Sequence, residues 1–332
     1  MIKNNEIEHV LAYNNSNYAC NQGSIIKLNN DELFLGYNQE RGLIHADSGQ
    51  SCFIKSNDDG KTWDVNTNKV IWPFNEYQGN WDCAFSQISD GSILMHTRVC
   101  SFIKSSALKV NSPQSFGGTT PDKSERLKRQ TGYSLLKSYD LGVTWDEPIP
   151  VNTSPISESG FAAYSVGGSG AGHIIELSDG GLLMPLHGSI TKEFVAQGGE
   201  QARTFVLRSD DKGNNWDFID ISDISPIGYT RNLVLDPNDI NTLYVSLGKA
   251  ARSRHGGLIR SKDLGRTWCR IDGGIAATST MMSLTINQQF PDNIYCATRD
   301  GQVFGTENGG TEWHNFHLPE GVKEVRAIVC TQ

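Results

Sequence analysis

The sequence predicts an all-β fold in which one small sheet is repeated along the chain. One eight-residue pattern, Ser-x-Asp-x-Gly-x-Thr-Trp, recurs five times, and a short strand-like run precedes each copy. Gly is also abundant, at 34 of 332 residues, as many tight turns require. A motif that recurs along a chain indicates a repeat architecture, in which each unit buries its apolar face against the next. We therefore expect a β-propeller, a ring of four-stranded blades in a single domain over residues 1–332.

The five copies, called boxes from here on, are turn sequences. They begin at Ser56, Ser138, Ser209, Ser261 and Thr306, and the last copy is degenerate. The Asp or Asn of a box can hydrogen-bond the backbone two residues on, and its Gly tolerates a positive φ. The Trp that ends each box is a large apolar anchor. Because every repeat contains the motif, we expect the boxes to belong to the scaffold and not to an active site.

The boxes and the strands before them resemble the Asp-box repeat, also called the BNR repeat, of the sialidase-like β-propellers. The resemblance extends over roughly residues 18–313. It implies the propeller fold, with a substrate site on the face opposite the boxes. Asp boxes also occur in lyases, other glycosidases and non-enzymatic propellers, so the resemblance specifies the fold more closely than the activity.

Each box follows two short β-rich runs joined by a polar turn, which gives four strands per repeat. The paired runs are 24–28 with 32–37, 84–88 with 92–96, 173–177 with 182–186, 231–235 with 242–246, and 282–286 with 293–297. Five full blades are therefore expected. The tail, 324–330, is typical of an inner strand, and the head, 7–13, could supply an outer strand of a sixth blade that closes the ring and removes its free edges. We favour six blades, and five are the alternative.

Composition excludes several classes of protein. The net charge of −8 argues against general nucleic-acid binding. No run approaches the roughly 20 apolar residues that span a membrane. The start of the chain lacks the apolar core of a signal peptide, so we expect a cytoplasmic protein, or a secreted one if a leader had been removed. Seven scattered cysteines without a C-x-x-C pair predict free thiols and no zinc site, and nothing in the sequence requires a cofactor or metal.

The loops on the face opposite the boxes, called the loop face, differ in length. They span residues 38–49, about 101–131, 187–203, 249–255 and 299–301. Long loops in a compact domain are usually functional, which favours a cleft on this face; neutral variation of surface loops is the alternative. The second and fourth loops are rich in Lys and Arg on an acidic chain. They favour a carbohydrate partner that is anionic, although a solvated surface explains the same charges.

Five residues are candidate catalytic groups. The resemblance implies an acid/base residue in the first loop, where Asp47 is the first choice and Glu40 the second. Asp82 begins the inner strand of the second blade and could accept hydrogen bonds from sugar hydroxyls. The resemblance also implies a Tyr–Glu nucleophile pair, for which Tyr229 and Glu158 could stand. Ordinary loop charges are the alternative for each acid.

Substrate-binding candidates share a place near the loop face and a side chain suited to sugars. Arg41 could clamp a carboxylate, and the Trp81 ring could stack on a sugar or pack between blades. The resemblance implies an arginine triad: Arg231 and Arg326 fit two members by position, while residues 18–24, which match the first, contain no arginine. The full set is Arg41, His45, Trp81, His96, Arg98, His173, His187, Arg203, Arg231, Arg254 and Arg326.

Three functions remain open from the sequence. A sialidase-like glycoside hydrolase acting on an acidic or decorated glycan would need carboxyl groups across the channel mouth. A uronate polysaccharide lyase of propeller fold would need His and Tyr near an Arg, because His is a suitable base near neutral pH. A non-catalytic propeller that binds carbohydrate or protein would need no cluster of ionisable residues.

Overall fold

The computed structural model shows an all-β chain. It describes residues 10–40, 42–43, 49–75, 77–104, 126–152, 172–188, 203–221, 224, 229–249, 253–318, 324–325 and 328–330. Within these ranges only the backbone is described at residues 22, 100–104, 126–131, 187–188, 203–204 and 220. Nothing in the described ranges forms a helix, and so none of them contains a helix long and apolar enough to cross a membrane.

Strands β1 to β8 form one antiparallel sheet that divides into two four-stranded halves. The halves meet at a single pair, Gly49 of β3 with Asn80 of β5. The first half, sheet 1, contains β1 (Cys20–Lys27), β2 (Leu33–Glu40), β3 (Gly49–Ser56) and β4 (Asp64–Trp72). The second half, sheet 2, contains β5 (Gln78–Gln87), β6 (Ile93–Lys104), β7 (Arg126–Ser138) and β8 (Ile149–Pro150).

Three further antiparallel sheets have four strands each. Sheet 3 contains β9 (Ile175–Glu176), β10 (Leu182–Gly188), β11 (Arg203–Ser209) and β12 (Asp217–Asp220). Sheet 4 contains β13 (Tyr229–Leu235), β14 (Leu243–Gly248), β15 (Gly256–Ser261) and β16 (Cys269–Arg270). Sheet 5 contains β17 (Met281–Ile286), β18 (Ile294–Thr298), β19 (Val303–Thr306) and β20 (His314–Phe316).

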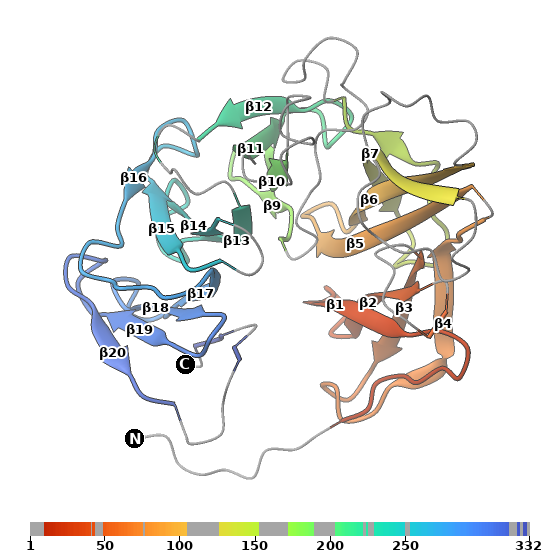
Figure 1. The fold of residues 1–332 in the computed structure, drawn as a ribbon, viewed down its shortest axis with the longest axis horizontal. Coiled ribbons are helices and arrows are strands. Elements are labelled where there is room, and N and C mark those ends of the chain that lie inside the picture. Colours follow the sequence, from red (N-terminus) through yellow and green to blue (C-terminus); the bar gives the residue numbers. More distant parts are fainter. Residues whose placement is uncertain are drawn as a thin grey trace.

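The sheets lie around a ring, each with its first strand toward the middle and its fourth strand at the outer edge (Figure 1). The expectation of an all-β fold built from four-stranded antiparallel sheets is therefore confirmed. Inner strands of neighbouring sheets are joined by a backbone N–H that donates to a side-chain oxygen. These donor and acceptor residues are Phe85 and Ser24 (3.2 Å), Ile174 and Ser86 (2.8 Å), and Leu284 and Asn232 (3.2 Å).

Every box joins the third and fourth strands of a sheet and closes the same hydrogen-bonded turn. In the second box, Ser138 Oγ accepts from the Gly142 N–H (2.8 Å) and donates to Asp140 Oδ1 (2.9 Å). Asp140 also accepts from the backbone N–H (2.8 Å) and hydroxyl (2.6 Å) of Thr144. These Thr144 bonds lower the pKa of Asp140 to about 2. Leu141 and Gly142 have φ of 57° and 88°, the left-handed conformation that the turn requires.

The degenerate last box keeps this turn with different side chains. Thr306 Oγ1 donates to Asn308 Oδ1 (2.8 Å), and Asn308 Oδ1 accepts from the Glu312 N–H (2.9 Å). The amide oxygen of Asn308 replaces one carboxylate oxygen of the full boxes. A carboxylate is therefore not needed to close the turn, which fits a structural role for the boxes.

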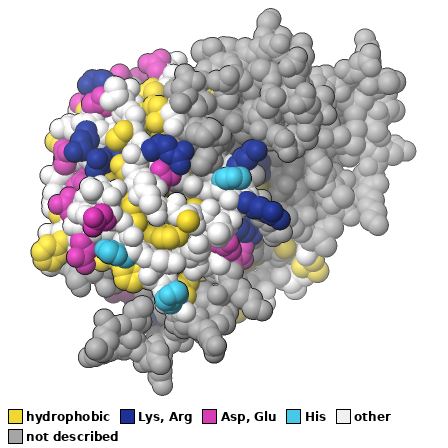
Figure 2. Space-filling view, turned by 60° about the vertical axis from the view of Figure 1, so that its left-hand side comes forward, with side chains coloured by type: hydrophobic (Ala, Val, Ile, Leu, Met, Phe, Trp, Pro, Cys, Tyr) yellow, Lys and Arg dark blue, Asp and Glu magenta, His cyan; other side chains and the backbone are white. Residues whose placement is uncertain are grey.

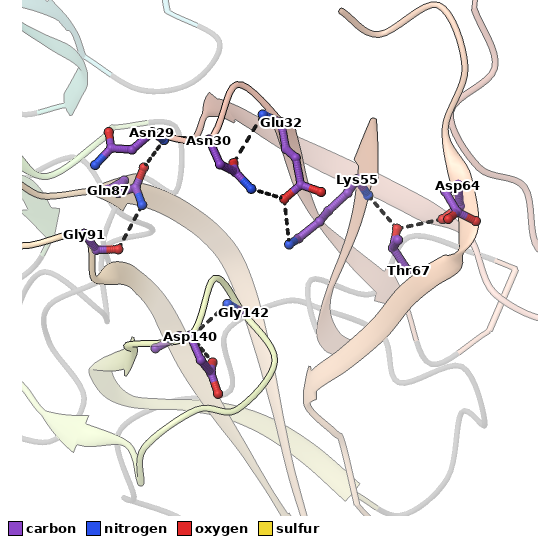
Figure 3. A network of polar contacts seen from close by, with 11 residues as sticks. Asn29, Asn30, Glu32, Lys55, Asp64, Thr67, Gln87, Gly91, Asp140 and Gly142 are labelled. Carbon is purple, nitrogen blue, oxygen red and sulfur yellow. Dashed lines mark hydrogen bonds and ion pairs between the residues drawn. The ribbon is translucent and has the colours of Figure 1, made fainter. Parts of the chain in front are cut away.

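Polar contacts also join neighbouring sheets on the box face. The Asn29 N–H donates to Gln87 Oε1 (2.7 Å), and Gln87 Nε2 donates to the Gly91 carbonyl (2.8 Å), which links the β1–β2 turn to the β5–β6 turn (Figure 3). Within sheet 1, Lys55 pairs with Glu32 at 3.1 Å. The turns of sheets 1 and 2 are thus held in a common plane.

The apolar core lies between sheets. Each main cluster of buried side chains draws on two neighbouring sheets and includes, or packs against, the box Trp of the later one. Trp145 of sheet 2, for example, packs with Phe34 and Phe53 of sheet 1, whose rings stack at 4.4 Å. Trp216, Trp268 and Trp313 occupy the corresponding places in the next three interfaces. The box Trp residues are therefore inter-sheet anchors, as the repeat pattern predicts.

One expected loop is shorter in the structure. The sequence predicts an insertion over about 101–131, but β6 and β7 continue their pairing as far as Lys104 with Arg126. Only residues 105–125 lie between these strands, and they are outside the described residues. The hairpin extends because Phe102 and Ile103 face Lys128 and Leu127 in regular antiparallel register, so the ladder bonds of the backbone continue.

Gly142→Ala should destabilise the protein more than Gly91→Ala. The two glycines have φ of 88° and 86°, so both alanines carry similar backbone strain, about 1–2 kcal/mol. A Cβ at position 142 would lie 2.9 Å from Phe34 Cε2 of the neighbouring sheet, whereas at position 91 it would meet nothing within 4 Å. We expect Gly142→Ala to lower the free energy of unfolding by about 1–3 kcal/mol more, as measured by urea denaturation. Equal losses would show that the inter-sheet contact does not constrain the box turn.

Candidate functional site

The described candidate residues come to one face because of the strand order. First strands begin, and second strands end, on the loop face. Glu40 ends β2, and Asp82 and Arg98 lie near the middle of β5 and β6. Tyr229 and Arg231 begin β13. Residues far apart in sequence thus approach the same end of the ring.

Buried polar side chains lie at both ends of the strands, and those at the box end are mostly Ser and Thr of the boxes and turns. In a β-sheet core such groups cost free energy unless they are hydrogen-bonded, so the set at the loop-face end, which includes amide, carboxyl and imidazole groups, needs a hydrogen-bond network. Each is at most 4% exposed: Asn38, Gln39, Glu40, Asn80, His96, Thr97, Thr230, Thr280 and Thr298. Their network is exemplified by Asn80, which accepts from Ser51 Oγ (2.5 Å) and donates to the Trp72 carbonyl (3.0 Å).

The inner strands have an irregular register at this same level. Shifts fall between Asn21 and Ser24 in β1, Trp81 and Ala84 in β5, Thr230 and Asn232 in β13, and Met281 and Ser283 in β17. Such bulges redirect side chains and are frequent beside functional sites. In these four strands the bulge interrupts the regular alternation of side chains. Side chains that would otherwise face a neighbouring sheet can therefore point toward the channel mouth.

Asp82 is the residue that the bulge of β5 redirects. Its φ is 57°, and the other described non-glycine residues with positive φ lie in turns. A left-handed L-residue costs about 1–2 kcal/mol, so the surrounding structure must hold Asp82 in place. Backbone strain of this kind clusters at functional sites.

Arg98 holds the Asp82 carboxylate. Arg98 Nη2 lies 3.0 Å from Asp82 Oδ2, and the two side chains are 21% and 14% exposed. The pair is thus half-buried at the loop face, within reach of a ligand. A charge-assisted bond of this kind fixes the orientation of the carboxylate.

Beside this ion pair, Tyr133 and His96 form a buried support. Tyr133 OH lies 2.5 Å from His96 Nδ1, and His96 Nε2 lies 2.7 Å from the Gly172 carbonyl. Because a carbonyl can only accept, Nε2 carries the proton, and Nδ1 accepts from the Tyr133 hydroxyl. Burial lowers the pKa of His96 to about 4, so the imidazole is neutral near pH 7. Burial, and then the charge of Asp82, raise the pKa of Tyr133 well above its usual value.

Several expected roles do not match the positions in the structure. Trp81 is 2% exposed, so its ring packs inside the molecule and does not offer a platform for a sugar. Glu40 is fully buried and accepts from Asn21 Nδ2 at 3.2 Å, and His96 is equally buried. His173 Nδ1 bonds the Phe85 carbonyl (2.7 Å) and so connects sheets 2 and 3. Trp81, Glu40 and His96 are therefore packed inside the molecule, while His173 is half-buried and lies between two sheets.

Tyr229 and Arg231 form a second half-buried pair at the start of β13. Arg231 Nη1 donates to Tyr229 OH at 3.1 Å, and its guanidinium carbon lies 5.8 Å from the centre of the Tyr229 ring. This geometry combines a phenol with a cation that could bind a carboxylate.

The remaining candidates are only partly placed. Arg254 is exposed after β14. His187 and Arg203 are described by backbone alone, opposite Thr204 and Gly188 at the ends of β10 and β11. Five further candidates lie outside the described residues: Arg41, His45, Asp47, Glu158 and Arg326.

Tyr133 is the contributor that the sequence analysis did not single out. It stands at the start of a strand before a box, where an aromatic residue is typical of core packing. In the β6–β7 register, Tyr133 lies directly opposite Arg98, which the sequence did single out. That pairing is known only from the structure, so the sequence alone could not connect Tyr133 to the site.

Metal binding finds no support in the described part of the chain. Within it, no three His, Cys, Asp or Glu side chains are placed to hold a metal ion. The six cysteines with described side chains are free thiols, and Cys52, Cys83 and Cys296 among them are buried.

Comparison with curated sequences found one partial relative. No family model matches the chain. A stretch of 105 residues is 28% identical to the oligoxyloglucan-reducing end-specific xyloglucanase of Emericella nidulans. The match includes 30% of this chain and 13% of the xyloglucanase, so the chain spans only a small part of that relative.

Solved structures match over most of the chain. A protein of unknown function from Dyadobacter fermentans has a TM-score of 0.70 at 19% identity, with 93% of this chain and 85% of that chain covered. The intramolecular trans-sialidase of Ruminococcus gnavus has a TM-score of 0.59 at 14% identity, with 91% and 85% covered. A Hadza microbial sialidase has a TM-score of 0.58 at 17% identity, with 89% and 57% covered. The chain therefore shares its fold with these solved structures, a sialidase and a trans-sialidase among them.

Burial of His96 predicts a specific dependence of stability on pH. Its pKa is about 4 in the folded protein, below the value of about 6.5 expected in the unfolded chain. The unfolded state therefore takes up the proton first, so the stability is complete above pH 6.5 and falls as the pH drops from 6.5 toward 4. The loss should reach about 3 kcal/mol. Urea denaturation between pH 7.5 and 4.5 measures it.

His96→Gln should reduce this slope, although the variant starts from a lower stability at pH 7.5. The Gln amide does not titrate in this range, while the other carboxyl and histidine groups remain. Parallel curves for the wild type and the variant would contradict the assignment of His96 as the buried neutral group.

Proposed function

We propose that this chain is a glycoside hydrolase that cleaves an acidic or decorated glycan at the loop face. The observation that carries the proposal is Asp82, a carboxylate held in a strained bulge and anchored by Arg98. The likeness in fold to a microbial sialidase and a trans-sialidase supports it as an analogy.

Asp82 supplies one of the two carboxyl groups that glycoside hydrolysis ordinarily uses. Arg98 orients it, and the neutral Tyr133–His96 pair supports the strand behind it. Asp47 or Glu158 supplies the second carboxyl group. Arg231 provides positive charge that favours an anionic sugar, because the charge of Arg98 is already paired with Asp82.

A polysaccharide lyase is the second candidate, and the Tyr229–Arg231 pair favours it. In β-elimination a base removes a proton next to a uronate carboxylate, while a cation neutralises that carboxylate. Arg231 Nη1 lies 3.1 Å from Tyr229 OH, so the pair places a cation and a phenol that could act as the base side by side at the loop face. Reducing ends without absorbance near 235 nm would indicate hydrolysis, and absorbance near 235 nm would indicate elimination.

We also infer that a sixth, composite blade closes the ring. The Ile328 N–H donates to Ser283 Oγ (3.4 Å) and the Cys330 N–H to Thr285 Oγ1 (3.1 Å), the kind of bond that joins inner strands elsewhere. Toward the other end of the chain, Tyr13 packs against the cluster of Tyr37, Cys52 and Ile54 in sheet 1. The described residues near the two chain ends thus contact sheets 5 and 1, the two sheets that the composite blade would join.

Asp82→Asn should abolish hydrolysis and leave the protein folded. The amide keeps the size of the side chain but cannot accept or donate the catalytic proton, so we expect kcat to fall by about 10²- to 10⁴-fold. The assay follows new reducing ends on a panel of acidic oligosaccharides, with thermal unfolding of each variant as a check.

Asp217→Asn is the matched control, because Asp217 is exposed on the outer strand β12. It should keep wild-type kcat. If Asp82→Asn retained wild-type activity while folded, Asp82 would not be catalytic. If Tyr229→Phe alone abolished activity and 235 nm absorbance accompanied turnover, the lyase would replace the hydrolase.

A further inference from the structure

A separate pocket opens on the loop face beside sheet 4. Its volume is about 480 Å³, within the range of small-ligand sites. Lys249, which follows β14, and His255, which precedes β15, line one side. Arg270 and Asp272, at the end of β16, line another, and Ala276 and Ala277 of the segment before β17 complete it. None of these residues belongs to the Asp82 site.

The pocket has an excess of positive charge. Arg270 and Asp272 neutralise one another through two bonds, Nε to Oδ1 at 2.9 Å and Nη2 to Oδ2 at 2.5 Å. Among the described residues, neither Lys249 nor His255 takes part in an ion pair, and both are exposed. Lys249 therefore adds a full positive charge that a ligand could use, on a protein whose net charge is −8.

This excess is local. Figure 2 turns the side of the ring that carries sheets 4 and 5 toward the viewer, and Lys and Arg side chains there are mixed with Asp and Glu. The described surface on this side of the molecule thus has no single sign of charge. A ligand attracted to the pocket must respond to the few cations that line it.

The floor of the pocket is rigid and partly apolar. Ile275 and Ala277 are half-buried and offer carbon atoms. Gly256 approaches the next segment so closely that a Cβ would lie 2.5 Å from the Ser279 carbonyl oxygen and 2.8 Å from Met281 N. Ser253 also ties the β14–β15 loop to this segment, because its N–H donates to Thr280 Oγ1 (3.3 Å). An apolar floor with cations at the rim suits the C–H face of a sugar ring that bears an anionic group.

We propose that this pocket is an accessory subsite that binds a carboxylated or sulfated sugar unit of the glycan, with the anion against Lys249 and His255. The inference rests on the proposed function, because the unit belongs to the chain that the Asp82 site cleaves. Sheet 4 lies across the ring from sheets 1 and 2 (Figure 1), so the bound unit lies away from the cleaved bond. The subsite selects long anionic substrates over short ones.

Calorimetric titration at low salt tests the subsite in the Asp82→Asn protein, which cannot consume the probe. The probes are trigalacturonate, a 6-sulfated galactose disaccharide and a neutral xyloglucan heptasaccharide. Lys249→Gln should weaken binding of the anionic probe about three- to fivefold. Ala276→Glu, which adds a carboxylate at the exposed floor, should weaken it about tenfold or more.

Lys262→Gln is the matched control, since Lys262 is exposed in the box of the same sheet, on the opposite face. It should bind within twofold of the parent, and all variants should unfold at a similar temperature. The carboxylated and sulfated probes together show which anion the pocket accepts.

The outcomes separate the subsite from the proposed function. Unchanged binding in both pocket variants, absence of binding by either anionic probe, or equal binding of the neutral probe would overturn the subsite. In any of those cases the hydrolase proposal would still be supported if the wild type cleaves the glycan and Asp82→Asn does not. Conversely, pocket-dependent binding together with a wild-type protein that releases no reducing ends from these glycans would overturn the hydrolase and leave the subsite standing.

Discussion

The apolar contact between neighbouring sheets is the interaction on which the rest of the structure depends. A four-stranded sheet in isolation exposes apolar side chains on its faces, and the core clusters form only where two sheets meet. Four of the five box Trp residues enter such an interface, and the Gly of the second, third and fourth boxes lets the turn approach the neighbouring sheet. The boxes therefore stabilise the contacts between sheets, and because they recur along the chain, the same contact is repeated around the ring.

The strands divide their length between two tasks. In β6, Ile93, Leu94 and Met95 near the box face are fully buried in apolar clusters, while His96 and Thr97 toward the loop face are buried and polar. Hydrophobic burial of about 25 cal/mol per Å² at the box-face end gives free energy that His96 and Thr97 do not supply. This division lets the loop-face end tolerate hydrogen-bonded polar groups and a strained Asp82 without loss of the fold.

The chemistry follows from which polar groups remain near solvent. Asp82 and Arg98 are half-buried at the surface of the site, whereas His96 and Tyr133 lie beneath them and complete each other's hydrogen bonds. The buried pair keeps its position because both partners are neutral near pH 7, so no charge must be hydrated. The proposed hydrolase activity depends on this arrangement, a rigid polar layer beneath a partly exposed carboxylate.

Local signals in the sequence determined the fold class. A box is closed by bonds between residues two to four apart, and strand pairs are joined by short turns, so periodicity and turn residues are enough to predict them. The position of Asp82, Arg98 and Tyr229 near the loop face also followed from the strand order. Tertiary structure alone decided what these side chains do. One bulge in β5 exchanges the faces of neighbouring residues, and so Trp81 turns inward while Asp82 meets Arg98. The Tyr133–His96 bond joins residues 37 apart, and its strength depends on burial that no local pattern encodes.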